Sequence, residues 1–200
     1  MRVPPPAVPE DRLDGWRQVE SSVERPFDAG LVRVTAHTVV YENATLAERL
    51  PRRPDSTPVR RFFFASRLRL APKPPASRTL FRLVADRSMA GFETKLRERG
   101  FLAVDRASER RFDVRGTEAR LAGYDARARA GGAVVGVRGW LAAWPTDARG
   151  EFLLAGGAYP TNVAEDDSME ADAGRSPSLA DAFDPERFRE ELFALIRATR

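Results

Sequence analysis

The stretch VRGWLAAWPTDARGEFLLAGGAYP, residues 137–160, has the pattern of a β-hairpin. Trp140, Ala142 and Trp144 occupy alternate positions in its first half, so their side chains would share one face of a strand. The segment PTDARG then carries the proline, aspartate and glycine that are typical of a turn, and a second apolar run follows it. We expect two antiparallel strands, with small residues beside the tryptophans that leave room for a large neighbour.

Alternating apolar and polar residues predict further strands on both sides of this hairpin. In one of them, RRFFFASRLRL, Phe62 and Phe64 face one side with Leu68 and Leu70, while the arginines mostly face the other. The full set of predicted strands covers residues 15–24, 30–42, 60–70, 110–116, 117–128, 133–144 and 151–160.

Two segments have the spacing of helices. Residues 77–100 place Leu80, Val84, Phe92 and Leu96 close to a four-residue repeat, and Gly100 is suited to end the helix. A last helix begins at Asp184 as its cap, with Pro185 at the first position. Its apolar stripe comprises Phe188, Leu192, Leu195, Ile196 and Thr199.

These elements predict an α+β fold, in which an antiparallel sheet packs against a long central helix and a C-terminal helix. Residues 1–14 are rich in proline, and we expect a disordered tail there. Residues 15–200 are expected to form a single domain. Residues 161–180 lack periodicity and predict a mobile acidic loop.

The composition is that of a globular chain, with 42% apolar residues and a net charge of +4. The chain contains no cysteine, which excludes disulfides, thiolate nucleophiles and thiolate metal sites. No run approaches the roughly 18 apolar residues of a membrane span, and the first residues lack the apolar region of a signal peptide. We expect a soluble, cytoplasmic protein.

The common catalytic and cofactor-binding motifs are missing from the sequence. The one histidine, His37, has no acidic neighbour on its face of the predicted strand between Leu31 and Tyr41, which disfavours a role as a general base. The acidic stretch of residues 165–172 lacks the spacing of a calcium loop, so a solvated loop fits it better than a metal site. We therefore predict no catalytic residue, no metal and no cofactor.

Two candidate binding sites remain. Trp140, Trp144 and Tyr159 form either part of the core under the last helix or the wall of a ligand pocket between sheet and helix. The middle of the chain is basic, and arginines beside phenylalanines favour contacts with nucleic acid or another polyanion if the strand is exposed. The residues of that second site would be Arg60, Arg61, Arg67, Arg69 and Arg78.

Several segments together resemble a haloarchaeal family of uncharacterised proteins, namely FRLVADRSMAGFETKLRERGF (81–101), GWLAAW (139–144), GEFLLAGGAYP (150–160) and FDPERFREELFALIRATR (183–200). The order of the elements is also similar to that of PsbP-like proteins, in which helices cover an antiparallel sheet. These motifs are ones that form the fold, and the resemblance implies no activity and no functional residues.

The sequence therefore favours a non-enzymatic domain that binds a small molecule or a protein partner. Binding of nucleic acid or another polyanion through the basic segment is the alternative, and an enzyme of an unfamiliar type is a third hypothesis.

Overall fold

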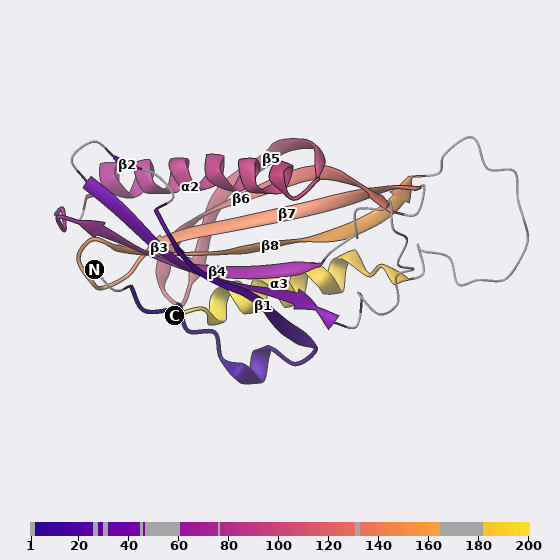
Figure 1. The fold of residues 1–200 in the computed structure, drawn as a ribbon, viewed down its shortest axis with the longest axis horizontal. Helices are drawn as coiled ribbons and strands as arrows, with labels where there is room; N and C mark the ends of the chain where they lie inside the picture. The colour runs from indigo at the N-terminus through magenta and orange to yellow at the C-terminus, as the bar shows by residue number, and fades with distance from the viewer. Residues whose placement is uncertain are drawn as a thin grey trace, which may run out of the picture.

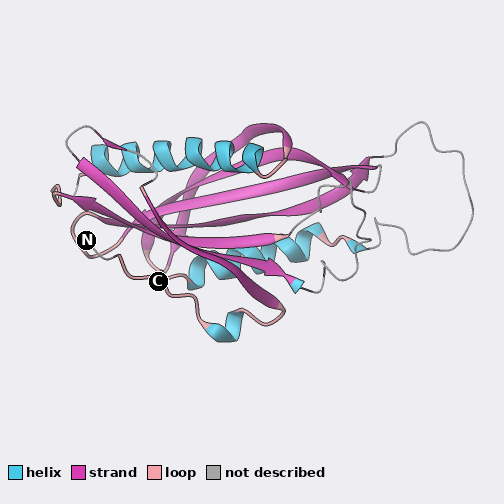
Figure 2. Ribbon diagram, viewed as in Figure 1, coloured by secondary structure: helices cyan, strands magenta, loops and turns pink. Residues whose placement is uncertain are grey.

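The computed structural model describes residues 3–25, 28–29, 32–44, 46, 61–75, 77–130, 133–164 and 182–200. In this part of the chain, eight strands form one antiparallel sheet and two α-helices lie against it (Figures 1 and 2). The strands are β1 (Trp16–Glu24), β2 (Asp28–Ala29), β3 (Val32–Asn43), β4 (Phe62–Ala71), β5 (Leu102–Val114), β6 (Thr117–Ala130), β7 (Ala133–Pro145) and β8 (Glu151–Ala164). The helices are α2 (Arg78–Glu98) and α3 (Pro185–Ala198), and a 3-10 turn, η1, spans Glu10–Arg12.

The predicted hairpin lies in the middle of the sheet. The strand order is β1-β3-β4-β8-β7-β6-β5, and β2 pairs with β3. β7 and β8 pair as expected, with Trp140 opposite Gly157 and Trp144 opposite Leu153. β8 also pairs with β4, which comes much earlier in the chain. The second strand of the hairpin therefore joins the early and late halves of the sheet.

The two helices cover opposite faces of the sheet (Figure 1). α2 packs on one face through residues such as Met89 and Leu96, and α3 packs on the other through Leu192 and Ile196. The fold class that we predicted, a PsbP-like α+β sandwich with a long central helix, is therefore wrong. The sheet itself is the central layer, and no described helix occupies that place. Its middle strands bury both faces, so each face needs its own cover.

Both helices begin at the residues that the sequence indicates. Ser77 accepts a hydrogen bond from the backbone N of Leu80 at the start of α2, and Asp184 accepts one from Arg187 N at the start of α3. Gly100, with a φ of 87°, follows the end of α2. These local signals place each helix in the chain, but they do not specify which face of the sheet it covers.

The proline-rich N-terminal stretch, predicted as a disordered tail over residues 1–14, is described from Val3 onward. Val3 is 2% exposed, and its carbonyl oxygen accepts a hydrogen bond of 2.9 Å from His37 Nδ1. Ala7 and Arg200 exchange two backbone hydrogen bonds of 2.6 and 2.8 Å. This stretch thus contacts β3 and the C-terminal residue, and Figure 1 shows it running past the C-terminus.

The acidic loop predicted at 161–180 falls mostly outside the described residues. β8 continues to Ala164, and residues 165–181 are not described. The loop and the single domain over residues 15–200 therefore stay predictions. Neither of the two described helices has the length and apolar character needed to cross a membrane.

Candidate functional site

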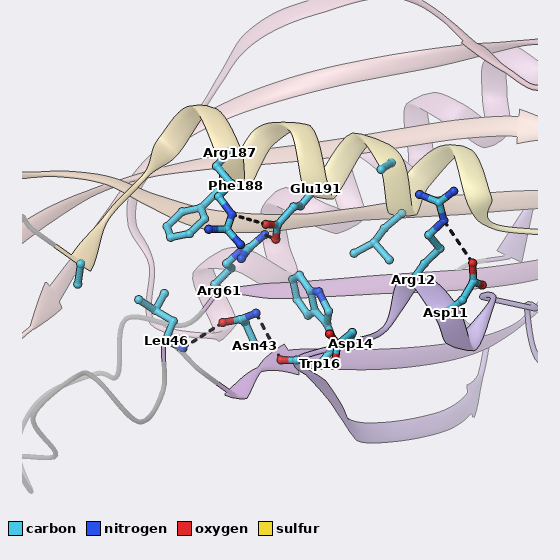
Figure 3. Close-up of a pocket in the computed structure, with 14 residues that line it drawn as sticks. Asp11, Arg12, Asp14, Trp16, Asn43, Leu46, Arg61, Arg187, Phe188 and Glu191 are labelled. Atoms are coloured by element: carbon cyan, nitrogen blue, oxygen red, sulfur yellow. Dashed lines mark hydrogen bonds and ion pairs between the residues drawn. The ribbon is translucent and has the colours of Figure 1, made fainter.

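A cleft opens beside α3, where η1 and the ends of β1 and β3 approach the helix (Figure 3). Its volume is about 580 Å³. Because its walls come from segments far apart in the sequence, the cleft exists only in the folded chain. The lining residues that define its chemistry are Trp16, Asn43, Arg61, Arg187, Phe188 and Glu191.

A buried arginine forms the inner wall of the cleft. Arg61 immediately precedes β4, and its side chain is only 5% exposed. The guanidinium carbon lies 4.9 Å from the ring centroid of Trp16 and 4.3 Å from that of Phe188, within the range of cation–π contacts. Nη2 donates a hydrogen bond of 2.5 Å to Glu191 Oε2. Two aromatic rings and one carboxylate therefore hold this cation in place.

Glu191 is shared between two arginines. Its other oxygen, Oε1, accepts a hydrogen bond of 2.8 Å from Nε of Arg187, one turn earlier on α3. Burial raises the pKa of the Glu191 carboxyl, but the bonds and charges of Arg61 and Arg187 outweigh burial and hold the pKa below its usual value. Burial also lowers the pKa of Arg61, and the bond to Glu191 opposes that effect. Two cations and one anion leave this end of the cleft positively charged.

Hydrogen bonds fix the rim of the cleft. Asn43 Nδ2 donates to the carbonyl oxygen of Gly15 at 3.4 Å, and Asn43 Oδ1 accepts from the backbone N of Leu46 at 3.0 Å. Asp11 and Arg12 of η1 form a pair at 3.6 Å whose side chains are mostly exposed. The rim therefore has a defined shape near Asn43 and faces solvent near η1.

The predicted tryptophan site lies in the core beneath α3. Trp140, Trp144 and Tyr159 are 9%, 4% and 3% exposed. The indole Nε1 of Trp140 donates to the hydroxyl of Tyr159 at 3.2 Å, and its ring centroid lies 5.2 Å from that of Phe193 on α3. The structure thus brings Trp140 and Tyr159 together as neighbours in the core, where α3 covers them.

The predicted polyanion site does not form one surface. Arg67 and Arg69 both contact the carboxylate of Glu151, which is 5% exposed, and Arg61 is buried in the cleft. Arg78 lies exposed at the start of α2, on the helix that covers the opposite face of the sheet. Arg60 lies outside the described residues. Three of the four described arginines therefore already contact carboxylates.

The remaining chemical groups that the sequence singled out have structural surroundings. His37 Nε2 lies 3.2 Å from Ser21 Oγ, while Nδ1 binds the Val3 carbonyl oxygen, so both ring nitrogens are engaged. Among the described residues, no three His, Asp or Glu side chains are grouped as metal ligands. The acidic stretch 165–172 lies outside that part of the chain.

Sequence reasoning missed the cleft because its key residues come from separate segments. Trp16 has no sequence pattern that links it to Phe188 or Glu191. One signal was nevertheless present: Arg61 directly precedes three consecutive phenylalanines, and such a run buries both faces of a strand. An arginine next to such a run needs a carboxylate or aromatic partner, because an unpaired buried charge is costly.

The chain was also compared with known proteins. A family model described as Domain of unknown function (DUF6517) matches residues 5–200. No curated protein and no solved structure matches the chain. Because the family model covers nearly the whole sequence, the chain belongs to the DUF6517 family.

Proposed function

We propose that this protein is a binding domain, and that it takes a small ligand in the cleft beside α3. The observation that supports the proposal is the buried guanidinium of Arg61, which lies between Trp16 and Phe188 at the inner wall of the cleft. A volume of about 580 Å³ falls in the usual range of ligand pockets, roughly 300–1,000 Å³.

The same cleft gives less support to catalysis. Its most buried carboxylate, Glu191, already accepts hydrogen bonds from Arg61 and Arg187, and its pKa is held below the usual range. A general base works best when its pKa lies near the operating pH, so this carboxylate is poorly suited to remove a proton. We therefore favour a binding domain over an enzyme.

Polyanion binding has weaker support. A groove for nucleic acid uses cations that reach phosphates, whereas Arg67 and Arg69 contact Glu151 and Arg61 contacts Glu191. A cytoplasmic location is part of our proposal and is consistent with the lack of cysteine. A haloarchaeal source rests on the resemblance of sequence segments alone.

The proposal can be tested by native mass spectrometry of the protein purified from its own cells. We expect a ligand mass that copurifies with the wild type. Ala194 lines the cleft and is half-buried, so Ala194→Trp should fill the space and remove that mass. Ala90→Trp is a matched control on the exposed side of α2, away from the cleft, and should retain it. No bound mass, or one that Ala194→Trp leaves unchanged, would count against the cleft.

A further inference from the structure

The charge at the inner end of the cleft is not balanced. Arg61 and Arg187 share the single carboxylate of Glu191, and the two cations come from different elements that meet there. Because Arg61 is buried between two rings, its charge is screened by water less than that of a surface arginine. A group with one negative charge would restore neutrality at this point.

The two guanidinium groups also have unused capacity to donate hydrogen bonds. A guanidinium carries five N–H donors. Among the described residues, both Arg61 and Arg187 donate a hydrogen bond to the carboxylate of Glu191. Arg187 is 73% exposed at its side chain, so it can turn toward a ligand without any change in the backbone. Guanidinium groups bind carboxylates in a planar, two-point geometry.

Part of the remaining wall of the cleft is apolar and could contact an apolar body. The ring of Trp16 lies at the cleft (Figure 3), and Ala194 and Leu195 of α3 also line it. Apolar walls with a few polar groups that fix orientation are the common form of small-molecule sites. A ligand that placed only its charged end between the arginines would cover this wall with the rest of its body.

From these observations we infer that the ligand is an organic carboxylate with an apolar body. Its carboxylate binds the guanidinium groups of Arg61 and Arg187, and its body lies against Trp16 and Ala194. A cationic ligand fits less well, because Glu191 is already bound by both arginines, Asp11 is paired with Arg12, and Asp14 is exposed to solvent. This inference rests on the proposed function of the cleft.

Three compounds that share an indole ring but differ in charge test the inference. Indole-3-acetate is an anion, indole-3-acetamide is neutral and tryptamine is a cation. We would titrate each into the 15N-labelled protein and follow the indole N–H of Trp16, assigned through Trp16→Phe. Indole-3-acetate should shift this signal and bind at least about tenfold more tightly than the other two, as expected for a charge-assisted hydrogen bond.

Variants separate a binding role of the arginines from a structural one. Arg187→Gln should weaken indole-3-acetate about tenfold, whereas Arg189→Gln, an exposed neighbour on α3 that does not line the cleft, should leave its affinity unchanged. Glu191→Gln removes the competing anion, so it should tighten indole-3-acetate binding by several-fold. A purely structural role for Glu191 would instead leave the affinity unchanged or lower it.

The results also distinguish this inference from the proposed function. If indole-3-acetamide or tryptamine binds at Trp16 as tightly as indole-3-acetate, the carboxylate class is wrong and the cleft remains a binding site. If none of the three shifts the Trp16 signal, the inference is overturned. The proposed function is then decided by the Ala194→Trp comparison.

Discussion

Glu151 is a buried acid that holds two arginines of the neighbouring strand. It begins β8 and lies opposite Arg69 of β4, and its carboxylate contacts Arg67 Nη1 and, at 2.7 Å, Arg69 Nε. Arg67 Nη2 also donates to the carbonyl oxygen of Arg200 at 3.0 Å. Burial raises the pKa of Glu151, but the bonds with Arg69 and Arg67 outweigh it, so the pKa lies below its usual value.

Glu151→Gln should lower the free energy of unfolding at pH 7 by about 3 kcal/mol, because it leaves two partly buried cations without their anion. The folded-state pKa is depressed, so the wild type has this stabilisation in full above the unfolded-state pKa, about 4.3, and loses it as the pH falls through the lower folded-state value. Urea unfolding at pH 7 and pH 3 should therefore show the difference shrinking in acid.

The matched control for Glu151→Gln is Glu118→Gln. Glu118 pairs with Arg111 at 3.4 Å, but the two side chains are 64% and 84% exposed. Exposed pairs contribute about 0–1 kcal/mol, so this variant should unfold almost like the wild type. Equal losses in the two variants would mean that burial of Glu151 does not strengthen its ion pairs.

The sequence predicted the faces of β4 better than the surroundings of its arginines. Alternation placed Phe62 and Phe64 on one side, and both belong to the core on the α2 face. Phe63, on the other side, is completely buried as well. The arginines of that side therefore lie at a covered face, and their partners come from β8 and α3. Alternation is a local property, so it carries no information about carboxylates so distant in the chain.

At the scale of elements, the N-terminal stretch is held mainly at two points. The first is the buried side chain of Val3 with its carbonyl bond to His37, and the second is the backbone pair of Ala7 and Arg200. Val8 and Leu13 also pack against the core on the α3 face. Because η1 belongs to this stretch, the same contacts position one wall of the cleft.

Ala7→Pro tests this attachment, because proline lacks the N–H that Ala7 donates to Arg200. We expect a loss of about 1 kcal/mol in unfolding free energy and faster hydrogen exchange of the Arg200 amide. Both measurements use the full chain. A proline placed in a helix, such as Ala90→Pro, is unsuitable as a control because it would break α2. Pro5→Ala, at an exposed position of the same stretch, should change neither quantity. Rapid exchange of the Arg200 amide in the wild type would instead support the disordered tail predicted from the sequence.

Most elements could be predicted because their boundaries are marked locally. α3 begins at its Asp184 cap and Pro185, and the turn at 145–150 separates β7 from β8. β5 departs most from its prediction: it spans Leu102–Val114, whereas the sequence predicted a strand only at 110–116. It lies at an edge of the sheet, most of its residues are exposed, and its register shifts twice. Bulges and exposure remove the alternation on which the prediction depends.

At the scale of the whole molecule, the arrangement depends on one pairing between distant strands. β4 and β8 join the early and late halves of the sheet, and residues that are neighbours along their ladder are far apart in the chain. Nothing local specifies that pairing, so the sequence could predict the strands without predicting their order. The cleft depends on the same pairing, because β4 carries Arg61 to the side of the sheet that α3 covers.

The sheet separates two hydrophobic cores, one beneath each helix. A Cβ on Gly139 of β7 would lie 3.5 Å from Leu96 Cδ1 of α2, and one on Gly157 of β8 would lie 3.1 Å from Leu192 Cδ1 of α3. Trp140, the residue after Gly139, is paired with Gly157. The two leucines thus lie over adjacent positions of β7 and β8, on opposite faces. A Cβ on Gly157 would collide with the backbone carbonyl of Phe62 and crowd Leu192, so glycine is needed there, whereas a Cβ on Gly139 would make only ordinary contacts.

Leu96→Ala and Leu192→Ala should each lower the free energy of unfolding by about 2–5 kcal/mol. The two side chains are only 1% and 2% exposed, so each substitution leaves a cavity in the core. The double variant should cost the sum of the single losses to within about 0.5 kcal/mol, since the hydrogen-bonded backbone between the two cavities keeps them from relaxing into one another.

The matched control is a pair of substitutions on one face, Phe92→Ala with Leu96→Ala. Both side chains lie 3.5 Å from the position of a Cβ on Gly139, so their cavities merge and their losses should not add. Urea unfolding of the single and double variants measures both couplings. A coupling energy above about 1 kcal/mol between Leu96 and Leu192 would show that the sheet transmits strain from one core to the other. An m-value lower than that of the wild type would show that the two faces unfold separately.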